Sequence, residues 1–122
     1  MSERQWRLSL QDMAEAVGKV LRYIQGMTRE QFFADSKTYD AVLRNLEILG
    51  EAAKNIPDAI KNKYPEIEWR KISGLRDIAI HRYFGINEDV LWDVLSIKLG
   101  ALQEKIETML PEVKNLDTPQ EN

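Results

Sequence analysis

The sequence predicts an all-α fold, an up-and-down bundle of four long helices and two short ones. Apolar residues recur at steps of three and four along most of the chain, which is the spacing of one helical face. The connections between these segments are short, and no segment alternates apolar and polar residues as a half-buried strand does. With 122 residues, the chain is long enough for one hydrophobic core. We predict a single helical domain over residues 1–111, followed by a flexible C-terminal tail over residues 112–122.

The first half of the chain should form two long helices with a short one between them. One apolar stripe predicts a first long helix that ends near Gly26, since its members share a face: Leu10, Met13, Val17, Leu21 and Ile24. Thr28 and Gln31 have the spacing of a capping box for a short helix over residues 29–34. A second long helix is expected over residues 37–56, because Pro57 closes an equally regular stripe.

The second half should form one short and two long helices. A short helix is expected over residues 58–63, and Pro65 is placed to begin a third long helix that reaches Phe84. Gly85 should stop that helix. Asn87 is a suitable N-cap for the last long helix, which we expect to end at Leu110 and Pro111.

Composition excludes several classes of protein. The chain has no cysteine, and its N-terminal segment lacks the apolar core of a signal peptide. Its apolar runs are far too short to span a bilayer, so a cytoplasmic protein is expected. A net charge of -3 argues against binding nucleic acid by overall charge alone. Between Lys61 and Tyr83, however, six basic residues stand against three acidic ones. Such a strip is ordinarily a solvated helix face, but this one surrounds the only histidine.

A metal or nucleotide cofactor is not expected. A carboxylate-bridged di-iron site in a helical bundle needs two Glu-x-x-His pairs, and the chain has one histidine. Glu47 and Glu51 share a helical face, which we interpret as solvated charge without a metal. The glycines are scattered singly, so no phosphate-binding loop is predicted.

One segment, from Gly74 to Gly85, carries most of the chemistry-bearing side chains. In an unbroken helix, Asp77 and His81 would be neighbours four residues apart, and Arg76 would share a face with Tyr83. Asp77 could then accept a hydrogen bond from His81 and fix its tautomer, while Arg76 supplies a permanent cation for a phosphate. The ordinary alternative is a histidine that complements the helix dipole.

RNA cleavage without a metal needs a base, a cation and an acid. One chain offers a single histidine, so the acid and the base would have to come from two copies packed about a two-fold axis. The residues therefore suggest a homodimer as the functional unit, if this segment is catalytic.

The segment Arg76 to Tyr83 resembles the Arg-x4-His-x-Tyr motif of the HepT group within the HEPN superfamily. The stretch from Arg44 to Lys54 is similar to the second long helix of that family, and the residues from Trp69 to Leu75 resemble the approach to its motif. The resemblance spans roughly residues 8–110. It implies a dimeric helical bundle with a composite Arg–His cleft that acts as a metal-independent endoribonuclease toxin on messenger or transfer RNA.

Carried onto this sequence, the resemblance makes Arg76 and His81 the catalytic pair, supported by Asp77. It also implies a minimal nucleotidyltransferase antitoxin, which in some pairs attaches AMP to the motif tyrosine, here Tyr83. Further contacts to RNA would come from the basic residues Arg70, Lys71 and Arg82.

Two other hypotheses stay open at this stage. The chain could be a non-catalytic HEPN module that binds a nucleotide or a partner protein, or a plain helical scaffold. Exposed apolar residues on the third and last long helices are candidates for the dimer face: Trp69, Ile78 and Trp92.

Overall fold

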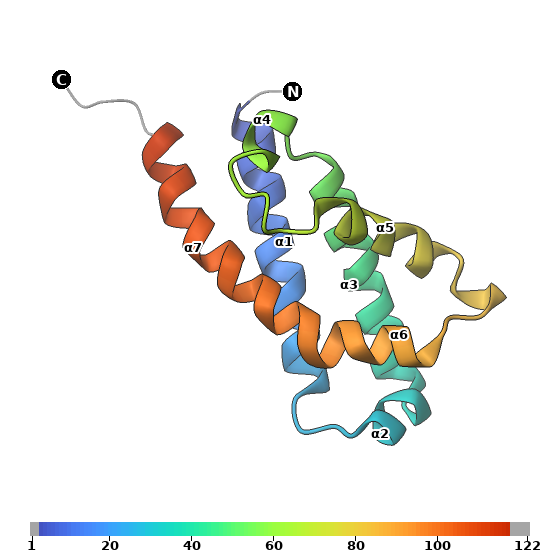
Figure 1. Cartoon of the computed structure of the whole chain (residues 1–122). Helices are drawn as coiled ribbons and strands as arrows, with labels where there is room; N and C mark the ends of the chain where they lie inside the picture. The colour runs from blue at the N-terminus through green and yellow to red at the C-terminus, as the bar shows by residue number, and fades with distance from the viewer. Residues whose placement is uncertain (1–2, 118–122) are drawn as a thin grey trace.

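The computed structural model describes residues 3–117 and confirms the all-α prediction (Figure 1). Within this range the chain contains helices and no strand. In chain order the elements are α1 (Glu3–Ile24), α2 (Arg29–Ala34), α3 (Ser36–Lys54), α4 (Asp58–Lys61), α5 (Trp69–Ile80), the 3-10 turn η1 (Arg82–Phe84), α6 (Glu88–Asp93), the π-helical η2 (Val94–Lys98) and α7 (Leu99–Asp117).

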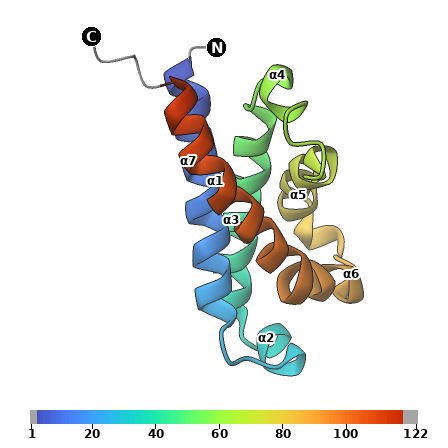
Figure 2. The same cartoon turned by 60° about the vertical axis from the view of Figure 1, so that its left-hand side comes forward.

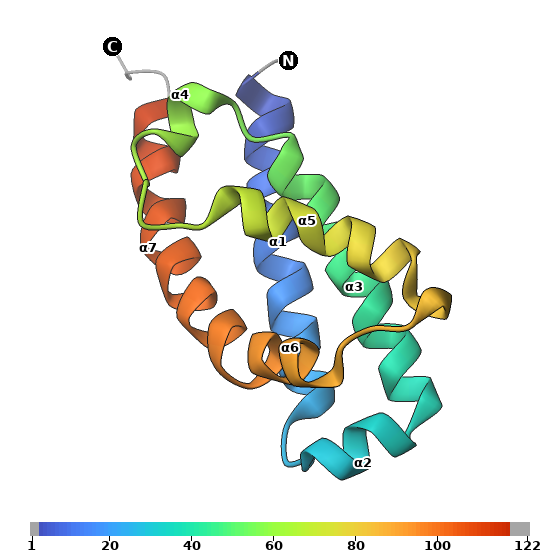
Figure 3. The ribbon, with the colours of Figure 1, turned by 45° about the vertical axis from the view of Figure 1, so that its right-hand side comes forward.

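The long helices α1, α3 and α7 run up and down, and α5 packs across α3. The start of α1 and the end of α7 lie at one end of the bundle, and α2, which follows α1 and precedes α3 in the chain, lies at the other end (Figures 1 and 2). Figure 3 shows α5 lying obliquely across α3. The site-bearing end of α5 therefore projects to one side of the bundle.

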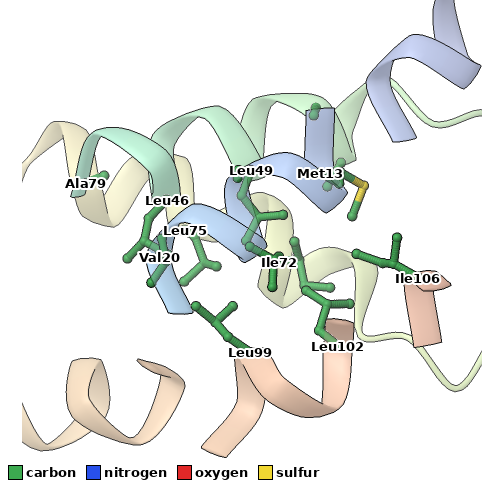
Figure 4. Packing of buried hydrophobic residues seen from close by; sticks show 14 of the residues in the cluster. Met13, Val20, Leu46, Leu49, Ile72, Leu75, Ala79, Leu99, Leu102 and Ile106 are labelled. Atoms are coloured by element: carbon green, nitrogen blue, oxygen red, sulfur yellow. The ribbon is translucent and has the colours of Figure 1, made fainter. Parts of the chain in front are cut away.

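The core is built from the apolar stripes that the sequence predicts. Met13 and Val20 of α1, with Leu46 and Leu49 of α3, are fully buried. Figure 4 shows that α5 and α7 add a second set of side chains to the same cluster: Ile72, Leu75, Leu99, Leu102 and Ile106. At about 25 cal/mol per Å² of apolar surface removed from water, this cluster is the main stabilising contribution to the fold.

The third long helix is shorter than predicted at both ends. It begins at Trp69 rather than Glu66, because Trp69 packs into the core and its Nε1 donates a hydrogen bond to the Tyr64 carbonyl at 3.1 Å. It ends at Ile80, where the chain turns into η1. The prediction that Trp69 is exposed is wrong, because only 8% of its surface is accessible.

The last long helix differs from its prediction in two ways. A π-helical turn, η2, lies within it, and such a turn is a common cause of a bend in a helix. The helix also continues through Pro111 to Asp117. Pro111 lacks the N–H that would pair with the Glu107 carbonyl, but it is exposed, so water can hydrogen-bond there. Glu112 accepts a hydrogen bond from the Tyr64 hydroxyl at 2.7 Å, which joins the first residue of the predicted tail to the bundle.

Candidate functional site

The candidate site lies where α5 changes into a tighter turn. The His81 N–H donates to the Asp77 carbonyl at 3.1 Å, and the Phe84 N–H then donates to the His81 carbonyl at 3.0 Å. Gly85 follows with φ of 103°, a conformation that glycine adopts without a steric penalty. His81 itself has φ of -94° and ψ of 22°, outside regular helix. The side-chain positions expected for an unbroken helix therefore do not apply beyond Ile80.

Arg76 lies on the side of α5 that faces α3, between two carboxylates. Its Nε is 2.7 Å from Glu51 Oε2, and its Nη1 donates to Asp77 Oδ1 at 3.3 Å. The Arg76 side chain is 37% exposed, so the guanidinium is accessible from solvent. It borders a polar cavity of about 360 Å³ that is shared by α1, α3 and α5, with Asp12, Arg44 and Glu47 among its lining residues.

Gly50 allows α3 and α5 to meet at Arg76. A Cβ atom at residue 50 would lie 2.5 Å from the Arg76 backbone nitrogen and 2.9 Å from the Arg76 Cβ. Those distances are too short for any larger residue, so only glycine permits this approach of the two backbones.

His81 is exposed and stands beside an exposed aromatic ring. The centroids of the His81 and Phe84 rings are 6.0 Å apart, and Phe84 is 74% exposed. Among the described residues, no hydrogen bond joins the side chains of His81 and Asp77. The Asp77 carboxylate accepts from Arg76 instead. The two residues are linked through the backbone, and the predicted side-chain pair is not formed.

The residues after His81 add positive charge to the site. Arg82 is exposed, and its charge acts on Tyr39 of α3. Burial raises the pKa of Tyr39 from its ordinary value, and the Arg82 charge opposes that rise. Tyr83 belongs to η1, but its side chain lies outside the described part of the chain, so its predicted modification stays a prediction.

Lys71 is not brought together with Arg76. Its Nζ pairs with Glu68 Oε2 at 2.8 Å, and this pairing raises the pKa of Lys71. Lys71, Ile78 and Val90 line an apolar groove of about 400 Å³ between α5 and the helices α6 and α7. Arg70 is exposed at the start of α5. Roles for Arg70 and Lys71 in binding RNA therefore stay predictions.

The predicted apolar dimer residues differ in their exposure. Ile78 is 39% exposed, as predicted. Trp92 is half-buried, with its ring 5.8 Å from the Phe32 ring, and Trp69 is in the core. Among these three residues, Ile78 is the one that offers substantial apolar surface.

Two residues beside the site were not predicted from the sequence. Glu51 is largely exposed, in keeping with its interpretation as solvated charge, but its carboxylate also pairs with Arg76, which the sequence did not predict. Gly50 was a sequence signal for a close helix contact beside Glu51. Glycine inside a helix lowers stability, so its presence indicates that a neighbouring element needs the space. Phe84 is the second of these residues, and its sequence signal was weaker. It is an aromatic residue immediately before Gly85, where the helix was expected to stop.

The part of the chain described, residues 3–117, contains no group of three His, Asp or Glu side chains close enough to hold a metal ion. Nor does this range include a helix that is long and apolar enough to cross a lipid bilayer.

Comparison with known proteins connects the chain to ribonucleases. The family model described as "Ribonuclease HepT-like" matches residues 13–109. The chain is similar to "Putative RNase MJ0127" of Methanocaldococcus jannaschii, with 37% identity over 117 residues that cover 96% of this chain and 97% of the relative.

Other relatives come from further organisms. "Probable ribonuclease HepT" of Thermococcus cleftensis is 42% identical over 100 residues, which are 82% of this chain and 91% of the relative. "Putative RNase TTE0752" of Caldanaerobacter subterraneus is 33% identical over 95 residues, which are 78% of this chain and 85% of the relative. No solved structure matches the chain significantly.

Proposed function

The chain belongs to the HepT-like ribonuclease family, and we propose that it is a metal-independent endoribonuclease whose active site contains Arg76 and His81. One observation carries the choice of residues. A permanent cation and an exposed imidazole lie within two turns at the end of α5, where the helix opens into η1. These are the side chains that RNA cleavage without a metal requires.

The reaction we propose is an internal transfer at one phosphodiester. A neutral His81 takes the proton of the ribose 2′-hydroxyl, and the 2′-oxygen forms a new bond to phosphorus. Arg76 stabilises the charge of the phosphorane. The bond to the 5′-oxygen then breaks, and that oxygen takes a proton from a protonated His81. The products are a 2′,3′-cyclic phosphate and a free 5′-hydroxyl.

The acid and the base must be two different imidazoles, so the proposed enzyme is a homodimer. The chain has one histidine, and a two-fold axis beside the end of α5 would bring a second His81 and a second Arg76 into the same cleft. The exposure of His81, Arg82 and Phe84 supports this arrangement, because a composite cleft must be lined by surface residues.

Phe84 supports single-stranded RNA as the substrate. Its ring is 74% exposed and lies 6.0 Å from the His81 ring, so a base next to the cleaved phosphate could stack on it. Arg82 offers a phosphate contact on the same turn.

The biological setting we propose is a toxin–antitoxin pair in the cytoplasm. The chain would be the toxin, and a minimal nucleotidyltransferase would be its antitoxin. The Tyr83 hydroxyl would attack the α-phosphate of ATP, forming an O–P bond and releasing pyrophosphate, and Arg82 would balance the charge of the attached AMP. Phosphate attached to η1 would obstruct the cleft. The motif resemblance supports this part of the proposal.

Purified protein tests the enzymatic proposal. Wild type should cleave a single-stranded RNA in the presence of EDTA, and His81→Ala should cleave it about 100- to 10,000-fold more slowly. Arg76→Ala should also slow cleavage, and Arg44→Ala, its matched control, should cleave as wild type does. Arg44 borders the same polar cavity and is likewise paired with a glutamate. Wild type that binds RNA without cleaving it would favour the binding-module hypothesis instead.

Expression in cells without a partner tests the toxin proposal. Wild type should arrest growth and degrade RNA, and His81→Ala should do neither. Coexpression with the nucleotidyltransferase encoded beside the gene should restore growth and add the mass of AMP to Tyr83. A Tyr83→Phe chain that cleaves RNA but is still neutralised would refute modification as the mechanism.

A further inference from the structure

We propose that Glu51 is a positioning residue, which holds the Arg76 guanidinium in the orientation that phosphate cleavage needs. The inference rests on the proposed function, because it assigns a role toward a reaction at Arg76. It goes beyond the Arg–His motif, since Glu51 belongs to a different helix and no local pattern links it to that motif.

The contact between the two residues joins separate helices. Glu51 Oε2 of α3 lies 2.7 Å from Arg76 Nε of α5. The Glu51 side chain is 55% exposed and that of Arg76 is 37% exposed, so the pair lies at the surface, where phosphate can reach it. Surface ion pairs contribute little to stability. The role that we assign to this contact is therefore the orientation of Arg76, not the stability of the fold.

Consecutive residues of α3 hold both ends of the Arg76 side chain. Gly50 lies against the Arg76 backbone so closely that a Cβ atom would come within 2.5 Å of its nitrogen. Glu51 then meets the guanidinium at the far end. Fixing both ends removes much of the rotamer freedom of a long side chain, which would otherwise be lost during the reaction.

The charge of Glu51 allows a positioning role to be distinguished from a role in binding RNA. A carboxylate close to Arg76 opposes the attraction between that cation and a phosphate. Removing the Glu51 charge should therefore leave RNA binding unchanged or improve it. If Glu51 orients the guanidinium for the phosphorane, the same change should slow the chemical step. The expected signature is a lower kcat with an unchanged or lower KM.

Glu47 provides a matched control on the same helix. It borders the same polar cavity and pairs with Arg44 Nη1 at 2.9 Å, one helical turn before Glu51. Glu47→Gln and Glu51→Gln each remove one surface charge and keep the size of the side chain. A general effect of charge or packing would appear in both variants, whereas positioning of Arg76 would appear only in Glu51→Gln.

Steady-state cleavage of an RNA oligonucleotide tests the proposal on the intact chain. We expect Glu51→Gln to lower kcat about tenfold to 100-fold, with KM no higher than in wild type, and Glu47→Gln to match wild type. Unchanged kcat in Glu51→Gln would overturn the proposal, as would a raised KM with wild-type kcat. Equal losses in both glutamine variants would overturn it too. Circular dichroism should show the same helix content in all three proteins.

A spectroscopic readout distinguishes failure of this inference from failure of the proposed function. The ¹⁵N–¹H signal of Arg76 Nε, assigned with Arg76→Lys, should shift or broaden in Glu51→Gln and stay in place in Glu47→Gln. Wild type that does not cleave RNA would refute the proposed function alone. In that case the Nε signal decides the inference: a change confined to Glu51→Gln supports the positioning of Arg76, and no change overturns it.

Discussion

The side chains of Arg76 and His81 differ in how many contacts hold them in place. Arg76 is anchored by Gly50 at its backbone and by two carboxylates at its guanidinium. His81 has its backbone fixed by Asp77, but its ring contacts Phe84 at the surface. A fixed cation with an exposed imidazole suits a site in which further atoms, from RNA or a second protomer, complete the geometry around His81.

Phe84 gives a prediction at this scale. If its ring stacks on a base, Phe84→Tyr should bind a non-cleavable 2′-O-methyl RNA as wild type does, because the π face is kept. Phe84→Leu should lose affinity by about 1–3 kcal/mol. Fluorescence anisotropy with a labelled oligonucleotide measures both. If Leu is as good as Phe, the residue serves an apolar protein contact, and sedimentation of Phe84→Asp should then show altered assembly.

At the scale of helices, the crossing of α3 and α5 decides where Arg76 lies. We predict that Gly50→Ala destabilises the protein by about 1–3 kcal/mol, because the methyl group forces the two helices apart. Urea unfolding followed by circular dichroism measures this loss.

Gly74 of α5 supplies the opposite expectation. A Cβ atom there meets nothing within 4 Å, so Gly74→Ala should stabilise the helix by about 0.5–1 kcal/mol. Equal effects of the two alanine variants would contradict the close approach at Gly50.

The start of α3 gives a pH-dependent prediction. Hydrogen bonds from the backbone and side chain of Thr38 lower the pKa of Asp35, the N-cap of α3, from 3.8. A lowered folded pKa means that the stabilisation is complete above pH 3.8 and is lost as the pH falls below that value. Thermal unfolding should show a smaller loss of stability between pH 6 and about pH 3 in Asp35→Asn than in wild type. Asp40→Asn, which removes a carboxylate that caps no helix, should follow the wild-type curve.

At the scale of the whole molecule, a single histidine makes the proposed reaction depend on two copies. When wild type is mixed with an inactive His81→Ala chain, only dimers of two wild-type chains should be active. Activity should therefore be proportional to the square of the wild-type fraction. An equal mixture should keep about a quarter of the activity once subunits have exchanged. Activity that falls linearly would mean that one His81 is sufficient. Light scattering on the same samples checks that the chains form dimers.

The sequence by itself determined the features that depend on neighbouring residues. The Thr28 and Gln31 capping box forms both of its hydrogen bonds, and Asn87 caps α6 through the Val90 N–H. The apolar stripes that predicted the long helices form the core. Each of these features acts within a few residues, so spacing along the chain is enough to find it. The Arg–His motif is likewise a local pattern.

Only the tertiary structure decided how the site is assembled. The pairing of Glu51 with Arg76 depends on the crossing of two helices, and spacing along the chain does not encode that crossing. The Asp77–His81 side-chain pair failed because the backbone leaves regular helix at His81. Trp69 was predicted to be exposed, yet it packs in the core. The physical reason is common to all three: side-chain contacts follow from the packing of whole helices and from the point at which each helix ends.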